Sequence, residues 1–365
     1  MFNRYVFFWK IGILTMAGSL AAWWLYGHIV PALQSWPSVL PFLLLSFCFT
    51  LSHNAIHALP IAAVKVLAWT GGIWLGFIIY SAFAAAAFAL LYVLSLAGGC
   101  SQLWQSWAPS IALLCAATVV ILLLHSAWKA FHPIYRTVTL SVPAISSPVT
   151  LAFVTDIHLS PILSTWHTRR LVRKLMQLQP DCILFGGDLI DAHWDFVRRD
   201  GSYAPLLDLK APFGIYAVYG NHDYFDSSIT ELSQSLPSLH FLCNDRAYLP
   251  EHIVLTGLND YLHEPANDVP PAVDGAYNIL MDHEPLRIAQ AGRQGYDLYL
   301  GGHTHGGQFF PVTAITKRLF PLSFGTARFG SLTAIVSSGY GFWGLPLRTG
   351  PAPEIVVLRL QPISQ

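Results

Sequence analysis

The first 155 residues of this 365-residue chain contain no acidic residue, since all 20 aspartates and glutamates lie at or beyond Asp156. The same stretch has only five lysines and arginines, and residues 66–128 carry no charged side chain of either sign. So little charge excludes a water-exposed fold for this part, because soluble surfaces are built mainly from charged and polar residues. The zero net charge therefore averages two unlike halves.

Cysteine is also scarce. The spacing of the five cysteines matches neither a disulfide framework nor a metal-binding motif; they are Cys48, Cys100, Cys115, Cys182 and Cys243. Unpaired thiols fit a reducing compartment and argue weakly against a secreted protein.

The apolar half predicts a bundle of about four membrane-spanning helices, because about 20 apolar residues suffice for one span. We place them at residues 11–33, 38–58, 67–97 and 106–128. The third is long for a single span, which leaves open a tilted or protruding helix, or a break near residues 84–87. The further apolar runs argue against a cleaved signal peptide.

Basic residues predict the orientation of these spans. Connections 34–37 and 98–107 carry none, and the basic residues that flank the spans all fall on the other side; they are Arg4, Lys10, Lys65, Lys129 and Arg136. The positive-inside rule then places the amino terminus and everything after residue 129 in the cytoplasm, in a bacterial inner (cell) membrane.

After a short linker the composition becomes that of a soluble α/β domain. We expect the transmembrane region and linker to cover residues 1–139 and the soluble domain residues 140–365. Five apolar, β-rich runs end abruptly in Gly, Asp, Asn or His; they lie at residues 149–158, 181–191, 214–223, 277–285 and 297–307. Leucines at helical spacing predict a crossover helix at 168–179, and a second helix is expected at 286–292.

Polar clusters follow all five runs, at the ends of strands, and we expect them to meet at a single sheet edge, where open α/β sheets bind ligands. They are Asp156 and His158; Asp188; Asn221, His222 and Asp223; His283; and His303 and His305. Each cluster alone is explained as a turn or a hydrogen-bonded histidine. Together they predict a divalent metal site, since carboxylate, amide and imidazole ligands suit Mn²⁺, Fe²⁺ or Zn²⁺, and no cysteine lies nearby for a structural zinc.

In sequence the five clusters read D-x-H, G-D-x-x-D, G-N-H-D, H and G-H-x-H. This pattern, complete and in order, resembles the calcineurin-like metallophosphoesterases over about residues 148–361. The run GGHTHGGQ and the ending at 337–360 look most like the bacterial membrane-anchored branch related to the YkuE and YaeI phosphodiesterases. The resemblance implies a four-layer αββα sandwich following the all-α transmembrane bundle.

The resemblance also implies two divalent ions, Mn²⁺ first, with Fe²⁺, Zn²⁺ or Mg²⁺ as alternatives, that generate hydroxide from a shared water. Asp188 would bridge them. The first ion would take Asp156, His158 and His305, and the second Asn221, His283 and His303.

Catalytic and substrate contacts follow from the same resemblance. His222 would stabilise charge or protonate the leaving group, with Asp191 or Asp223 orienting its ring. Asn221 and Arg348 are the expected substrate contacts, although a salt bridge from Arg348 to Glu354 is an equal alternative.

These residues predict a membrane-anchored phosphohydrolase that cleaves a phosphodiester or pyrophosphate bond, on a lipid-linked or nucleotide-linked substrate. The segment GDLIDAH lacks the Arg-Gly pair of the related protein phosphatases, which argues against protein phosphatase activity.

Only 15 lysines and arginines accompany the 20 acids of the soluble part, which argues against nucleic acid as a partner. The bilayer and the phosphoester are the expected partners, and no protein partner is indicated.

Three other classes of protein are alternatives to this phosphohydrolase. A catalytically silent membrane receptor or scaffold would retain the fold without activity, but it should have lost ligands, and none is missing. A transporter would need polar groups inside its spans, where His53, His57 and His125 are the few candidates. An amidohydrolase also uses His-x-His but lacks the Gly-Asn-His-Asp block.

Overall fold

A computed structural model describes residues 4–191, 193–225, 229–264 and 268–363. The chain divides into two compact units, the first comprising Met1–Trp128 and Gly344–Leu347, the second Lys129–Trp343 and Arg348–Gln365. Each unit is described by itself.

The first unit is helical. Its elements are α1 (Arg4–Gly27), the short 3-10 turns η1 (Pro31–Gln34) and η2 (Trp36–Ser38), α2 (Val39–Ser46), α3 (Cys48–Asn54), α4 (Ile61–Ala97) and α5 (Ser101–Ala130). Four segments are long and apolar enough to cross a membrane: Val6–Gly27, Trp36–Asn54, Ile61–Ala97 and Ser101–Ala130. The expected number is therefore confirmed, but all four segments begin earlier than predicted. The first two also end earlier, the third ends at Ala97 as predicted, and the fourth ends later, at Ala130. The second is broken at Phe47, between α2 and α3.

The long third segment forms one continuous helix of 37 residues, so the break considered near residues 84–87 is absent from α4. At 1.5 Å per residue it extends about 55 Å, well beyond the roughly 30 Å hydrocarbon core of a bilayer. Ala85 and Phe88 of α4 are buried against Ala22 and Leu25 of α1 and against Ala112 of α5. The run of four alanines at residues 84–87 therefore packs against other helices of this chain.

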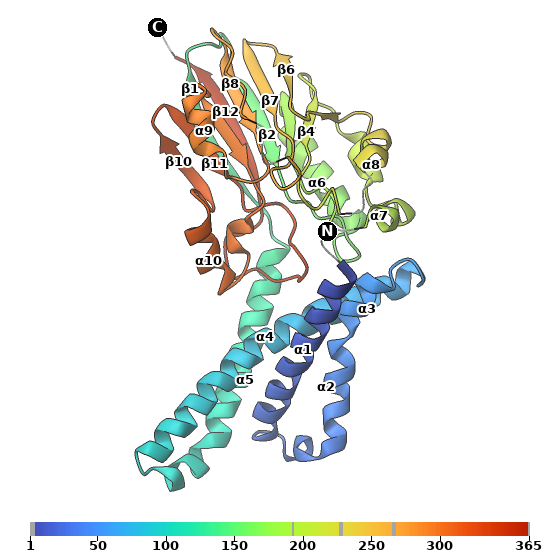
Figure 1. The fold of residues 1–365 in the computed structure, drawn as a ribbon, viewed down its shortest axis with the longest axis vertical. Helices are drawn as coiled ribbons and strands as arrows, with labels where there is room; N and C mark the ends of the chain where they lie inside the picture. Colours follow the sequence, from blue (N-terminus) through green and yellow to red (C-terminus); the bar gives the residue numbers. More distant parts are fainter. Residues whose placement is uncertain (1–3, 192, 226–228, 265–267, 364–365) are drawn as a thin grey trace. The chain divides into compact units, whose positions relative to one another are not determined.

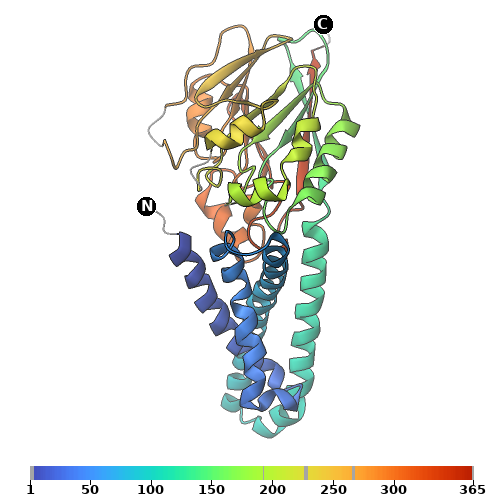
Figure 2. The ribbon, with the colours of Figure 1, turned by 90° about the vertical axis from the view of Figure 1, so that its right-hand side faces the viewer.

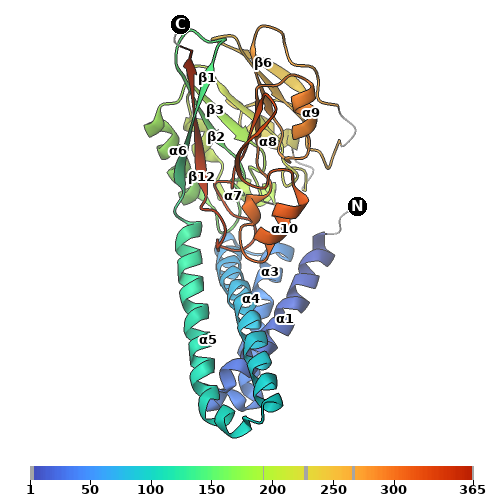
Figure 3. The same ribbon diagram turned by 90° about the vertical axis from the view of Figure 1, so that its left-hand side faces the viewer.

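In the second unit, one sheet has six strands in the order β1-β12-β2-β3-β4-β5. Their bounds are β1 (Ile134–Val142), β2 (Val149–Val154), β3 (Cys182–Gly186), β4 (Ile215–Val218), β5 (His240–Phe241) and β12 (Glu354–Pro362). Strand β1 pairs in parallel with β12 along its whole length, and the two lie side by side in Figure 3. The predicted boundary near residue 140 is therefore too late, because the alternating residues taken for a linker form this strand.

The second sheet also has six strands, in the order β10-β11-β9-β8-β7-β6. They are β6 (Asp245–Leu249), β7 (Ile253–Gly257), β8 (Tyr277–Met281), β9 (Leu298–Gly301), β10 (Gly325–Phe329) and β11 (Leu332–Val336). The buried residues of both sheets form one hydrophobic core between them, in which Phe153 and Leu184 meet Leu255 and Ile279. Figure 1 shows the two sheets face to face.

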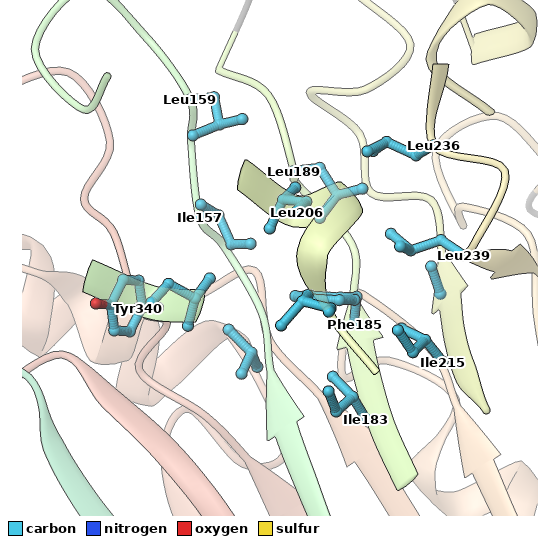
Figure 4. Close-up of a cluster of buried hydrophobic side chains, with 14 of the residues drawn as sticks. Ile157, Leu159, Ile183, Phe185, Leu189, Leu206, Ile215, Leu236, Leu239 and Tyr340 are labelled. Atoms are coloured by element: carbon cyan, nitrogen blue, oxygen red, sulfur yellow. The ribbon is translucent and has the colours of Figure 1, made fainter. Parts of the chain in front are cut away.

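Helices cover the outer face of each sheet. On the first sheet lie α6 (Thr165–Leu178), α7 (Trp194–Asp200), η3 (Ala204–Asp208) and α8 (Ile229–Ser235). This green-to-yellow layer faces the viewer in Figure 2. Its core brings Ile183 and Phe185 of β3 and Ile215 of β4 together with Leu206 and Leu236 (Figure 4). On the second sheet lies α9 (Ile288–Arg293), and two further elements follow β9, η4 (His305–Gly307) and α10 (Val312–Leu319).

These layers confirm the predicted four-layer αββα sandwich after a helical region. Strands β2, β3 and β4 run parallel in one sheet, and β7, β8 and β9 run parallel in the other. The polar clusters come from both sheets, whereas we expected a single sheet edge. The correction has a simple cause, since alternating strands and polar turns do not reveal to which sheet a strand belongs.

Candidate metal centre

Backbone geometry in the loops after the strands is unusual. Five residues without a glycine's freedom have positive φ values near 50–68°: Asp156, His158, Asp188, His303 and His305. Such conformations cost energy and persist where the surrounding structure holds them, most often at functional sites. All five were predicted metal ligands.

The glycines beside these residues allow the backbones to approach closely. A Cβ atom at Gly302 would lie 2.5 Å from Asp156 Oδ2, and one at Gly220 would lie 2.3 Å from Asp188 Oδ1. Only a residue without a side chain fits at either position.

The first group of candidate ligands brings β2 and β9 together. Asp156, His158 and His305 present ligand atoms within 4.8 Å of one another, and all three side chains are buried. His305 Nε2 lies 3.4 Å from Asp156 Oδ1 and 2.9 Å from His158 Nε2. Thr155 donates a hydrogen bond of 2.8 Å to Asp156 Oδ2 and so fixes that carboxylate.

The second group joins β3, β8 and β9. Asp188, His283 and His303 also present ligand atoms within 4.8 Å of one another. Asp188 Oδ2 lies 3.1 Å from His283 Nε2 and 3.7 Å from His158 Nε2, so this carboxylate stands between the two groups. The Asn221 amide oxygen lies 2.8 Å from His303 Nδ1. The structure therefore brings the seven predicted ligands together.

The donor atoms of the second group fit a divalent ion. His283 Nδ1 lies 2.7 Å from the Gly186 carbonyl and donates to it, which leaves the Nε2 lone pair facing the Asp188 carboxylate. His283 Nε2 is buried and has no hydrogen-bond partner among the described residues. Two acceptors that face each other in a buried site need a proton or a cation between them.

The first group also offers nitrogen acceptors to an ion. His158 Nε2 and His305 Nε2 lie 2.9 Å apart, so only one of them carries a proton that points at the other, and an ion bound by both would replace that proton. Arg348 Nη2 lies 3.1 Å from His305 Nδ1, but its two hydrogens go to the nearer carbonyls of Ser338 and Gly341.

Neighbouring charges and burial shift the pKa values of the groups in the site. Burial by itself would raise the pKa of Asp188, but His283 and His222 outweigh it and hold that pKa well below its ordinary value. Burial opposes the charged form of His283, yet the Asp188 carboxylate dominates and holds the pKa of His283 well above the ordinary value. Burial lowers the pKa of His303 to about 3, so this imidazole is neutral and able to bind a metal.

His222 lies at the open side of the site, where its ring stands edge-on to His158 with centroids 4.8 Å apart. Its backbone N–H donates to Asp188 Oδ1 over 2.8 Å. Burial lowers the pKa of His222, but Asp188 and Asp191 outweigh it and raise the pKa to about 9. The ring is therefore protonated at neutral pH.

Asp191, rather than Asp223, faces the His222 ring. Its Oδ1 lies 3.4 Å from His222 Nδ1 and 3.3 Å from His158 Nδ1. Asp223 is fully buried and accepts hydrogen bonds from the backbone N–H groups of Asp188, Ile190 and Gly220. It therefore shapes the loops that hold Asp188, which corrects the expectation that it orients the imidazole.

Arg348 differs from the expected phosphate clamp. The side chain is fully buried and donates to the carbonyls of Ser338 and Gly341 over 2.6 Å each, besides its contact with His305. Glu354 is held by Arg136 instead, through two hydrogen bonds of 2.9 Å. Arg348 is therefore enclosed by the loop that precedes β12 and is absent from the lining of the cleft described below, and the alternative salt bridge to Glu354 is made by Arg136.

A cleft of about 230 Å³ opens on the site, and sequence reasoning missed most of its lining. Besides Asp188, His222, His303 and His305, it is lined by Phe309, Val312, Phe320 and Trp343. Gln308 holds Trp343 through two hydrogen bonds between its amide and the Trp343 backbone, of 2.8 and 2.9 Å. In the sequence, the one feature that pointed to this part of the cleft is the polar Gln308, which directly follows the glycine pair Gly306–Gly307.

The histidines of the helical unit do not form a comparable site. His53 is buried and stacks on Phe8 with ring centroids 4.1 Å apart, and its Nδ1 lies 3.0 Å from the Phe49 carbonyl. Among the residues that the structure describes, every group able to hold a metal ion lies between Asp156 and His305.

Known proteins share this site-bearing domain. A family model for the calcineurin-like phosphoesterases matches residues 149–307. An uncharacterized metallophosphoesterase of Helicobacter pylori strain J99 is 31% identical over 254 residues, which cover 65% of this chain and 68% of the relative. A transmembrane protein with metallophosphoesterase domain from Bos taurus is 30% identical over 280 residues, 69% of this chain and 62% of that protein.

A third relative is the uncharacterized metallophosphoesterase YkuE of Bacillus subtilis, 29% identical over 220 residues, which cover 56% of this chain and 77% of YkuE. The similarities span the strands that carry all seven candidate ligands. The chain therefore belongs to the calcineurin-like metallophosphoesterase family.

Proposed function

We propose that this chain is a membrane-anchored phosphohydrolase that uses two divalent metal ions, Mn²⁺ being the first candidate, to cleave a phosphodiester or pyrophosphate bond. The single observation that carries the proposal is the position of Asp188, whose carboxylate stands 3.1 Å from His283 Nε2 and 3.7 Å from His158 Nε2. A carboxylate shared by two ligand groups is what a paired-ion site requires.

Two ions held in this way would supply positive charge for the phosphoryl oxygens and lower the pKa of an attacking water. The protein's own residues do the rest. The ligand loops fix the ligand atoms in a buried site, where electrostatic interactions are stronger than in water. No side-chain nucleophile is needed.

His222 protonates the leaving oxygen or stabilises the charge that develops on it. Its ring lines the same cleft as His303, which supports this role. Asp191 orients His222 and His158 together. Asn221, whose amide oxygen lies 2.8 Å from His303 Nδ1, would help to hold the second ion and would contact the substrate.

The substrate is lipid-linked or nucleotide-linked, and the catalytic domain lies on the cytoplasmic side of a bacterial cell membrane. The basic residues on one side of the four apolar segments support this orientation. Attachment to the bilayer keeps the site near membrane-bound substrates, which supports the lipid-linked class.

The test uses the full chain in nanodiscs, loaded with Mn²⁺, on bis-p-nitrophenyl phosphate and a panel of lipid and nucleotide phosphoesters. Asp188→Ala should lower the rate by roughly three orders of magnitude or more and reduce the bound metal, because the shared ligand is lost. Asp181→Ala is the matched control. It removes a carboxylate at the opposite end of the same strand, where Asp181 accepts the backbone N–H of Thr150 over 2.8 Å.

Metal binding without hydrolysis of any substrate in the panel would overturn the proposal and favour a silent receptor or scaffold. Equal losses in Asp181→Ala and Asp188→Ala would point to a folding defect rather than to the metal centre.

A further inference from the structure

The cleft at the metal centre has a lining of two unlike kinds. Asp188, His222, His303 and His305 contribute polar side chains. Four apolar side chains, called the apolar wall below, complete the lining: Phe309, Val312, Phe320 and Trp343. A phosphoryl group needs only the polar part.

The apolar wall is attached firmly to the ligand loop. The Phe320 ring stands edge-on to the His303 ring, with centroids 5.7 Å apart. Gln308, three residues after His305, fixes Trp343 by the two hydrogen bonds described above. Helix α10 carries Val312 on the side of the cleft, and its Thr316 hydroxyl is bound to Ser323 over 3.0 Å. The wall is therefore a built part of the site.

Apolar surface continues past the cleft. Phe320 also lines a second hollow of about 660 Å³, together with Leu322 and Phe324. Three large apolar side chains near α10 remain exposed: Phe310 by 55%, Ile315 by 48% and Leu319 by 66%. Exposed apolar surface beside a polar site marks a place where an apolar ligand or surface binds.

The charge of this segment suits an anionic amphiphile. Residues 298–353 contain no aspartate or glutamate and carry Lys317, Arg318, Arg328 and Arg348. Lys317 and Arg318 stand in the last turn of α10, and both are exposed. A negative phosphoester therefore meets no repelling carboxylate along the apolar wall.

We infer that the apolar wall binds a hydrocarbon chain on the substrate's phosphoryl group, so that Phe309, Val312, Phe320 and Trp343 select an alkyl or acyl phosphoester over a nucleotide. This inference rests on the proposed function, phosphoester hydrolysis, and narrows the class of substrate that is hydrolysed. Binding of the chain, in contrast, needs only the cleft and can be measured without turnover.

The experiment compares methyl and octyl p-nitrophenyl phosphate as substrates, and methyl- and octylphosphonate as ligands in calorimetry, with the full chain in nanodiscs. Burial of two or three methylenes in the cleft should favour the octyl compounds by about 15- to 60-fold. Val312→Asn should reduce this preference by about tenfold, because it puts an amide into the apolar wall. Ile315→Asn is the matched control, since Ile315 lies on the same helix but does not line the cleft.

Comparison of the two variants in the same nanodiscs removes the effect of partition into the bilayer. Phe309→Ser serves as a second wall variant in case Val312→Asn fails to fold, which its Mn²⁺ content and circular dichroism would reveal. A lost octyl preference in either folded wall variant, retained in Ile315→Asn, supports the inference.

The inference is overturned if wild type shows no octyl preference, if Ile315→Asn loses it as much as the wall variants, or if a methyl ester of uridine monophosphate is preferred. If neither ester is hydrolysed but octylphosphonate still binds more tightly to wild type than to Val312→Asn, the proposed hydrolysis fails and the inference stands.

Discussion

At the scale of single residues, the site is controlled by which nitrogen of each imidazole faces the protein. The Gly186 carbonyl occupies Nδ1 of His283, and Asp191 stands beside Nδ1 of His158, so both rings direct Nε2 inward. Partners of this kind fix the ring orientation and commonly change metal affinity by about 10- to 100-fold. His222 is different because it lines the cleft; it forms a third candidate group with His158 and Asp191 and belongs to neither of the two groups described above.

Replacing His222 by Asn should therefore lower kcat by about 10²- to 10⁴-fold, the usual contribution of a general acid, without changing the metal content. Steady-state rates together with elemental analysis of the purified protein check this. His240→Asn is the control, since His240 is exposed on β5. Loss of metal in His222→Asn would identify the residue as a ligand, and an unchanged kcat would remove it from catalysis.

His167 should make the folding stability of the second unit sensitive to acid. Burial, followed by the nearby Arg170, lowers the pKa of His167 to about 3, whereas an unfolded histidine titrates near 6.5. The neutral ring therefore favours the folded state above pH 6.5, and this stability is lost as the pH falls toward 3. At pH 4.5 the loss amounts to about 2–3 kcal/mol.

His167→Phe keeps an apolar ring there and removes the titration. We expect its thermal midpoint to fall less than that of wild type between pH 6.5 and 4.5, as measured by scanning fluorimetry. Parallel pH profiles of the two proteins would contradict the assignment.

At the scale of elements, β1 and β12 decide how the site domain is closed. The register of this parallel pair aligns Ile134 with Glu354 and Val142 with Pro362. Arg136 on β1 forms a salt bridge with the carboxylate of Glu354, and the Glu354 side chain is only 1% exposed. The same Glu354 precedes the strand that pairs with β2, and β2 leads directly to Asp156.

Arg136→Met should destabilise the domain by about 3–5 kcal/mol, because it leaves a buried carboxylate without its partner. Hydrogen exchange of the β12 amides in the full chain measures the loss. The double variant Arg136→Met with Glu354→Gln should recover part of it, since no unpaired charge remains. Arg359→Met, at an exposed position of β12, is the control, and an equal effect there would refute the role of the ion pair.

At the scale of the whole molecule, the question is on which side of the membrane the site works. The four apolar segments and the named relatives make this a membrane protein. Four spans would return the chain to the side on which it began, and the positive-inside rule predicts from the basic flanks that this side is the cytoplasm.

A reporter joined after Gln365 tests the orientation. Green fluorescent protein should fluoresce at that position in a bacterial host, and alkaline phosphatase should be inactive, because the latter folds only outside the cytoplasm. Active alkaline phosphatase would reverse the predicted topology.

Local sequence was sufficient for features that depend on one segment. The absence of charge in residues 66–128 requires apolar helices whatever surrounds them, and the five polar clusters follow strands whose apolar runs are visible in the sequence. Helix α6 was predicted from its leucines, and the glycines beside His303 and His305 predicted a tight loop. The four-layer fold followed from the resemblance that these clusters carry.

Features that join distant segments were decided only by the tertiary structure. Strand β1 reads as a linker until β12, more than 200 residues later, pairs with it. The roles of Asp191, Asp223 and Arg348 depend on which backbone groups come within reach of each side chain, and sequence spacing contains no such distances. The apolar wall of the cleft arises in the same way, because Phe309, Val312 and Trp343 read as ordinary hydrophobic residues until folding brings them into one cleft with the metal ligands.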